Sequence, residues 1–421
     1  MKKVEKLYWR KLDDQAKIYS LSYNKKDTSV FRLSILLKDK INPLNLQKAV
    51  EEVIEKYKVF KVKMRNGMFW NYLEENDLMP IISEEKEYPF QKLNTAENNN
   101  YLFKVTYFDK KINIDFFHIL TDGNNGATFF KEIIYKYIEL TYPDSITYTH
   151  LNCVKNLTDS ENAYIKNYKK QNIKTEKILK GYKIKGEELE DGIVEINHFI
   201  TNFDEIRKNA KYNECSLSVY IVSLFAYSIY IANYKTNEGR RPINICIPIN
   251  LKKYFPSETM SNFVSYMVVS LNLKHNKEYT FIDILNIVKK EFDKKLKFEK
   301  IVETMSANGK LIHNPIIRIV PLILKRMLVI LGSLNVKRQF TTTFSNIGKI
   351  EFDGQYTKYI ENLFFILAPD WAEKIRCGVC SYEEKLIISF GTNLNRSSIE
   401  IKFKELLEKE NITFEIEGNY V

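Results

Sequence analysis

The chain of 421 residues is predicted to fold as two α/β lobes in tandem, each a mixed sheet flanked by helices. Segments with strand and helix periodicity alternate in both halves of the chain. A stretch rich in lysine, glutamate and asparagine and poor in large aliphatic residues separates the halves. The chain is also longer than a domain with a single hydrophobic core usually is. We therefore expect an N-terminal lobe at residues 1–155, a linker at 156–191 and a C-terminal lobe at 192–421.

The first half shows its strand and helix signals in a regular order. A helix is expected at 43–57, because proline is favoured at the first helical position and apolar residues then recur on one face. A second amphipathic helix is expected at 126–140, capped by Asn124 or Asn125. The expected strands are 31–37, 59–64, 68–73, 102–108 and 112–119, the last two joined by a tight hairpin.

The second half repeats this style. Helices are expected where apolar residues recur with helical spacing, at 203–212, 216–232, 281–298 and 398–410. Strands are expected at the short runs of β-branched and aromatic residues, at 194–199, 243–249, 263–273, 340–350, 358–367 and 386–392.

The net charge of the chain indicates which classes of binding partner are expected. The formal net charge is +11, but the lysines are spread along the chain rather than clustered. A basic surface attracts the phosphates of coenzyme A or of membrane headgroups, whereas nucleic-acid binding needs basic residues gathered on one face. We expect no nucleic-acid partner. The sequence contains neither GxGxxG nor GxxxxGK[ST], so nucleotide binding through those loops has no support.

Cysteine usage and the N-terminus predict a reducing environment. Five cysteines, a small and odd number, cannot form a disulfide framework, and the N-terminal segment lacks the apolar core of a secretory signal. Both observations predict a cytoplasmic location. Cys377 and Cys380 form a CxxC without further metal ligands nearby, so we interpret them as strand residues and expect no metal site.

The most apolar stretch of the chain, residues 315–334, is interrupted by Arg318, Lys325 and Arg326. These charges argue against a membrane span, which needs about 20 apolar residues. One interpretation is a core or interface helix broken at Pro321. The other is a basic amphipathic helix at a membrane surface, with Arg318 and Lys325 on one face, which would add peripheral membrane contact to the cytoplasmic location.

Candidate chemistry lies at an HxxxDG motif formed by His118, Asp122 and Gly123, for which composition predicts far less than one match by chance. Strand alternation places His118 on the same apolar face as Ile114 and Phe116. Burial there lowers the pKa of an imidazole and keeps it neutral, as a general base at neutral pH requires. Asp122 and Gly123 end the strand, and Gly123 is expected to permit a tight turn.

With this motif the chain resembles the chloramphenicol-acetyltransferase-like superfamily, which includes alcohol O-acetyltransferases, polyketide-associated acyltransferases and condensation domains. The resemblance extends over most of the chain. The segment ICIPINLKK at 245–253 resembles the PVNLR strand of the second lobe, and TTFSNIG at 342–348 resembles the SNLG segment of the alcohol acetyltransferases. Phe117 stands where condensation domains usually have a second histidine, which favours the simple acyltransferase branches. The sequence has no DFGWG, which disfavours the plant-type acyltransferase branch.

The resemblance implies an inter-lobe tunnel that contains His118 as the general base. Acyl-CoA, or the pantetheine arm of an acyl carrier protein, would enter as co-substrate from one face. A small-molecule or lipid acceptor would enter from the other face. No tightly bound cofactor is implied, and the residues that bind coenzyme A are not identified.

The resemblance also implies roles for other residues. Asp122 and Gly123 would be positioning residues, with Asp122 paired to a cation of the second lobe. The arginine expected there appears as Lys252, and Arg241 and Arg376 remain alternatives. Ser345 or Asn346 would hydrogen-bond the oxyanion or contact the substrate, or else form a strand-end turn.

The predicted function is therefore acyl-CoA-dependent O-acyl transfer to a hydroxyl acceptor, similar to that of alcohol acetyltransferases. One alternative is a carrier-protein-dependent condensation or acyl-transfer enzyme that forms an ester or amide. Another is a catalytically silent family member that acts as a binding module.

Overall fold

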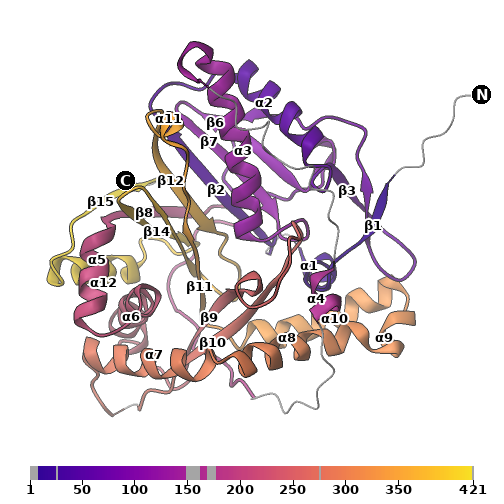
Figure 1. Ribbon diagram of the computed structural model, residues 1–421. Helices are drawn as coiled ribbons and strands as arrows, with labels where there is room; N and C mark the ends of the chain where they lie inside the picture. The colour runs from indigo at the N-terminus through magenta and orange to yellow at the C-terminus, as the bar shows by residue number, and fades with distance from the viewer. Residues whose placement is uncertain (1–7, 25–26, 148–161, 168–176, 275, 420–421) are drawn as a thin grey trace, which may run out of the picture.

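The computed structural model describes residues 8–24, 27–147, 162–167, 177–274 and 276–419 (Figure 1). Its two large sheets have five and seven strands, each sheet is mixed, and helices flank both. This confirms the predicted α/β fold class. A small antiparallel sheet that was not predicted joins three strands, β1 (Trp9–Lys11), β4 (Tyr72–Glu75) and β3 (Val62–Arg65).

The five-stranded sheet positions the HxxxDG motif. Its order is β12 (Ile360–Leu367), β2 (Val30–Leu37), β7 (Lys111–Phe117), β6 (Phe103–Phe108) and β5 (Ser83–Glu84). Helices α2 (Pro43–Lys56) and α3 (Gly123–Thr141) lie over one face of it in Figure 1. The side chains of Ile112, Ile114 and Phe116 are fully buried, and Phe116 lies edge-on to Phe129 of α3. The apolar face predicted for this strand is therefore the one that the helices cover.

The seven-stranded sheet forms most of the second lobe. Its order is β10 (Val264–Leu271), β9 (Ile243–Asn250), β11 (Thr342–Lys349), β13 (Ile375–Tyr382), β14 (Lys385–Thr392), β8 (Glu195–Asn202) and β15 (Phe414–Gly418). β11 runs parallel to both of its neighbours, and the other pairs are antiparallel. The helices of this lobe include α5 (Phe203–Tyr212), α6 (Leu217–Ile229), α7 (Phe281–Lys295) and α12 (Ser398–Lys409).

Strand β12 ties the two lobes together. It comes from the second half of the chain but pairs with β2 of the first, with Phe364 opposite Ser34. Phe364 and Phe365 are buried in the same core as Phe31. A boundary drawn along the chain therefore does not separate the two sheets, and the division into 1–155 and 192–421 stays a prediction about chain position.

The remaining elements lie around the sheets. They are α1 (Asp14–Ser22), α4 (Ala163–Asn167), α8 (Phe298–His313), α9 (Pro315–Ile319), α10 (Leu322–Lys337), α11 (Gly354–Thr357) and short helical turns at Ala96–Asn98, Pro143–Ser145, Tyr230–Tyr234 and Leu251–Lys253. Of the predicted linker, residues 156–161 and 168–176 lie outside the described residues. Within its described part, Tyr182 and Ile184 pack into the core of the second lobe.

The structure differs from the predicted strands in two respects. The strand expected at 68–73 begins only at Tyr72, because Gly67 and Trp70 form a turn in which the Gly67 N–H donates to the Trp70 carbonyl. Strands β13 and β15 were not predicted as such. β13 contains the small residues around Cys377 and Cys380, which point to opposite faces and pack into different cores. That arrangement supports their interpretation as strand residues.

The apolar stretch at 315–334 is broken at Pro321, as predicted, into α9 and α10. The prediction that Arg318 and Lys325 share one basic face is wrong for Lys325. The side chain of Lys325 is only 1% exposed, donates to the Phe69 carbonyl oxygen at 2.6 Å and lies over the Trp70 ring. The break changes the helical phase, so Lys325 does not share a face with the exposed Arg318.

Within the described chain, the helical segment Leu217–Tyr234 is the one long and apolar enough to cross a membrane. However, 72% of this segment is buried. It contacts α7 and α12 and contributes Phe225 and Ile229 to the core of the second lobe. We interpret it as the central helix of that lobe.

Candidate active site

His118 is the first residue after β7 and lies where the two lobes meet. Its backbone N–H donates to the Ser29 carbonyl at 2.9 Å. Its ring stacks on Tyr19 of α1, with centroids 4.7 Å apart, and meets Phe31 of β2 edge-on at 5.2 Å. Burial lowers the pKa of His118 below its usual value. The imidazole is therefore neutral at pH 7.

The amide of Asn262 determines which ring nitrogen of His118 carries the proton. The Asn262 amide nitrogen Nδ2 donates to the His118 carbonyl oxygen at 2.8 Å and to Asp13 Oδ2 at 3.1 Å. These two acceptors orient the amide, so its oxygen Oδ1 faces His118 Nδ1 at 3.0 Å. Nδ1 must then be the N–H donor. The other nitrogen, Nε2, consequently holds the lone pair that a general base needs.

Asp13 fixes Asn262 in turn. Its carboxylate accepts from both the backbone N–H and the side-chain amide of Asn262, and it caps α1 by accepting from the Ala16 N–H at 2.8 Å. Burial raises the pKa of Asp13 to about 6, so it is ionised at neutral pH. Because α1 also carries Tyr19, one buried carboxylate supports two of the groups that hold the imidazole.

None of these three residues was predicted from the sequence. Tyr19, Asp13 and Asn262 occur in no recognised motif, and Asn262 is 144 residues away from His118 along the chain. The strand expected at 263–273 follows Asn262 directly, and this proximity to a strand end was the one local signal available.

The connection between β9 and β10, residues 251–263, docks against the HxxxDG motif. Thr121 Oγ1 donates to the Met260 carbonyl at 2.8 Å, and Asn125 Nδ2 donates to the Ser261 carbonyl at 2.9 Å. From the other side, Arg10 Nη1 donates to Ser261 Oγ at 2.6 Å. The second lobe is thus hydrogen-bonded directly to the turn that carries His118.

Asp122 is the N-cap of α3, so the prediction of Asn124 or Asn125 at that position is wrong. Its Oδ1 accepts from the Asn125 N–H at 3.0 Å. Its Oδ2 accepts from Asn125 Nδ2 and from the Phe263 N–H, each at 3.2 Å. The helix begins three residues earlier than predicted because aspartate satisfies its first N–H groups better than the asparagines can from inside the helix.

Lys252 reaches Asp122 through Asn125. The Lys252 ammonium donates to Asn125 Oδ1 at 2.6 Å, and the amide of Asn125 donates to Asp122. Of the two alternatives, Arg241 is exposed ahead of β9, at the opposite end of that strand from Lys252. Arg376 forms ion pairs with Asp370 and Glu373 instead. Lys252 is therefore the one of the three that the structure brings to the motif.

Replacing Asp122 with alanine should lower the free energy of unfolding by about 1–3 kcal/mol, because a helix cap and a contact between the lobes are lost together. Chemical denaturation measures this change. Ser216→Ala, which removes the N-cap of α6 away from the motif, is the matched control and should cost about 1 kcal/mol. A full loss of activity in Asp122→Ala at wild-type stability would contradict the positioning role.

Gly123 allows close packing against neighbouring strands. It does not form the tight turn that was predicted. It is the first residue of α3, and its φ does not lie in the left-handed region. A Cβ at this position would lie 3.0 Å from Ile347 Cγ2 and 3.4 Å from Phe365 Cζ. Glycine therefore lets β11 and β12 approach the motif.

Strand β11 separates the two candidate oxyanion residues. Phe344 is buried in the core of the second lobe, so strand alternation places Ser345 on the opposite side of β11 from that core. Asn346 lies on the other side. Its amide nitrogen is 3.4 Å from Ser218 Oγ, and its amide oxygen accepts from the Gly348 N–H at 2.8 Å. Asn346 thus forms a strand-end turn.

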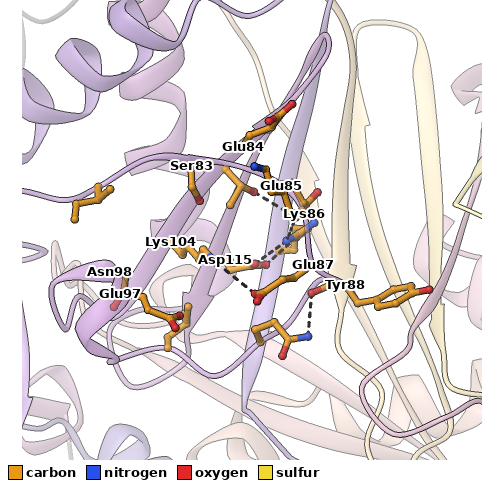
Figure 2. A pocket seen from close by; sticks show the side chains of 15 residues that line it. Ser83, Glu84, Glu85, Lys86, Glu87, Tyr88, Glu97, Asn98, Lys104 and Asp115 are labelled. Carbon is orange, nitrogen blue, oxygen red and sulfur yellow. Dashed lines mark hydrogen bonds and ion pairs between the residues drawn. The ribbon is translucent and has the colours of Figure 1, made fainter.

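A hollow of about 270 Å³ lies elsewhere, against the face of the five-stranded sheet opposite to α2 and α3 (Figure 2). Its lining includes the buried Arg32, which is paired with Asp115 and with Glu85. The lining has five carboxylates, Glu84 and Glu87 among them, against three cations, so its net negative charge disfavours the phosphates of coenzyme A. The hollow does not include His118, and we assign it no part in acyl transfer.

A sequence model of the alcohol acetyltransferase family matches residues 145–411, well over half of the chain. The matched range includes Asn262 and Ser345 and begins after the HxxxDG motif. No curated protein sequence matches the chain significantly.

Solved structures with the same fold cover nearly the whole chain at low identity. TRI101 of F. sporotrichioides, solved with coenzyme A and T-2, matches with a TM-score of 0.63 and 9% identity over 97% of this chain and 99% of its own. Polyketide synthase associated protein 5 of Mycobacterium tuberculosis matches with a TM-score of 0.57 and 12% identity over 94% and 96%. The starter condensation domain of rhizomide synthetase, solved with C8-CoA, gives 0.58 and 11% over 96% and 94%.

Proposed function

Because the chain belongs to the alcohol acetyltransferase family, we propose that it transfers an acyl group from acyl-CoA to a hydroxyl acceptor, with His118 as the general base. The observation that carries this proposal is the orientation of the imidazole. Asn262 holds the proton on Nδ1, which leaves Nε2 as the basic nitrogen. The pKa of His118, lowered by burial, keeps this base unprotonated at neutral pH.

In the proposed reaction Nε2 takes the proton of the acceptor hydroxyl while its oxygen attacks the thioester carbonyl. A C–O bond forms, and the carbonyl oxygen becomes an oxyanion. When the oxyanion collapses, the C–S bond breaks, and the thiolate of coenzyme A takes the proton back from the imidazolium. The products are an ester and free coenzyme A, and neither an acyl-enzyme nor a resident cofactor takes part. Tyr19 and Phe31 keep the imidazole in one orientation throughout.

Ser345 is our candidate donor to the oxyanion. Ser345→Ala should lower kcat roughly 10²–10³-fold, because a donor aimed at the developing charge is worth about 3 kcal/mol. Asn346→Ala is the matched control, since Asn346 lies on the other side of β11, and it should change kcat little. Steady-state kinetics of the two variants measure the difference. Equal losses in both would contradict the assignment.

The test of the function is release of free thiol from short and long acyl-CoAs in the presence of alcohols, amines or neither. Alcohol-dependent thiol release, with the ester detected by mass, supports the proposal. Turnover with an acylated carrier protein but not with acyl-CoA supports the carrier-dependent alternative instead. No turnover with any donor leaves the binding-module alternative. The proposed site of action is the cytoplasm.

A further inference from the structure

Helix α10 presents an unusually apolar surface to solvent. Five residues spaced along one side of it, each between 55% and 79% exposed, form what we call the α10 face: Ile323, Leu324, Met327, Leu328 and Leu331. Most soluble proteins keep contiguous exposed apolar patches small, and larger ones mark binding surfaces. In Figure 1, α9 and α10 lie at the edge of the molecule, and α10 packs against α1.

The apolar surface continues beyond α10. Ile319 at the end of α9 is 70% exposed, and Met68 is 78% exposed. The Leu322 N–H donates to the Met68 carbonyl at 3.0 Å, which places the turn before β4 beside the start of α10. Aliphatic side chains from three segments therefore extend this surface.

The opposite side of α10 is anchored to the protein by polar contacts. Lys325 bonds the Phe69 carbonyl and lies 3.6 Å from the centre of the Trp70 ring. Lys337 forms ion pairs with Asp27 and Asp370. Because this side holds the helix in place, the α10 face stays outward in the folded protein.

The chain segment that carries the α10 face has charged residues of one sign only. Residues 304–350 include no aspartate or glutamate and seven lysines and arginines. Three of these cations, Arg318, Arg326 and Arg338, are exposed on or near α10. An apolar helical face with arginines at its border fits a lipid surface, where aliphatic side chains enter the acyl region and cations meet phosphates.

The positive charge beside the α10 face argues against a second copy of the chain as its binding partner, and the apolar side chains of the face argue against an acidic protein. In a symmetric dimer through the α10 face, the arginines of one copy would meet those of the other. An acidic protein partner would match the arginines, but the five side chains of the face offer it no hydrogen bonds. We propose that the α10 face, with Ile319 and Met68, docks this protein on an anionic membrane surface.

The experiment is flotation of the full chain with vesicles of phosphatidylcholine, with or without phosphatidylglycerol, at low salt. Wild type should float with the anionic vesicles and less with the neutral ones. Changing Met327, Leu328 and Leu331 together to serine should weaken partitioning roughly tenfold or more. Arg318→Gln with Arg326→Gln should reduce binding to anionic vesicles only. The matched control, Ile282→Ser with Ile401→Ser, removes aliphatic residues of similar exposure from α7 and α12 and should float as wild type does.

Three results would overturn the proposal. The first is absence of wild-type flotation with anionic vesicles. The second is equal loss in the control variant. The third is a wild-type dimer in analytical ultracentrifugation that the triple serine variant converts to monomer, because the face would then bind a second copy. His118→Ala should float as wild type does, so failure of the proposed chemistry and failure of docking are separable.

Discussion

His118→Ala should lower the rate of acyl transfer roughly 10²–10⁴-fold, the range that general-base assistance usually supplies. The reason is that Nε2 is the nitrogen that Asn262 leaves unprotonated and the one placed to take the acceptor proton. Thiol release under saturating acyl-CoA measures the effect. The Michaelis constant for acyl-CoA should change much less, because the imidazole acts in the transition state rather than in binding.

His118→Gln separates the chemistry from the structure. Glutamine retains a polar side chain of similar size near Asn262 but offers no base, so it should lose as much activity as alanine. Both variants should unfold near the wild-type temperature, since the imidazole is half-buried rather than part of the core. A folded variant that turns over within a few-fold of wild type would refute the mechanism.

Asn262→Ala should lower kcat roughly 10–100-fold, because the imidazole then loses the partner that fixes both its orientation and its tautomer. It should also move the pH profile. The hydrogen bond that His118 donates to Asn262 Oδ1 raises the pKa of His118, against the larger lowering by burial, so its removal lowers this pKa further. A base must be unprotonated to act, so the acid limb of kcat/KM should shift to lower pH.

The shift of the acid limb of kcat/KM distinguishes a positioning role of Asn262 from a merely structural role. Asn250→Ala is the matched control, because Asn250 caps the turn at the other end of the same connection through the Lys252 N–H. It should lower stability and leave the acid limb in place. An Asn262→Ala variant with reduced activity and an unmoved acid limb would show that Asn262 only supports the fold.

Local periodicity accounts for the elements that were predicted well. Helix α5 runs over the predicted residues 203–212, because its apolar spacing, its Asn202 cap and its acidic first turn are all local in the sequence. β2 and β7 likewise match within two residues at each end. The prediction of secondary structure failed where a local sequence pattern fits both a strand and a turn. The aromatic turn at Met68–Trp70 has the composition of a strand but is held by α10.

The sequence by itself determined the two α/β lobes, the break at Pro321 and the choice of His118 as the candidate base, because each depends on residues close together in the chain. Only the tertiary structure decided what surrounds His118. Asp13 and Asn262 are 249 residues apart, and Asn262 and His118 are 144 apart. The insertion of β12 beside β2 and the burial of Lys325 are long-range packing outcomes of the same kind. Hydrophobic periodicity shows which face of an element is buried, but not which distant side chain it meets.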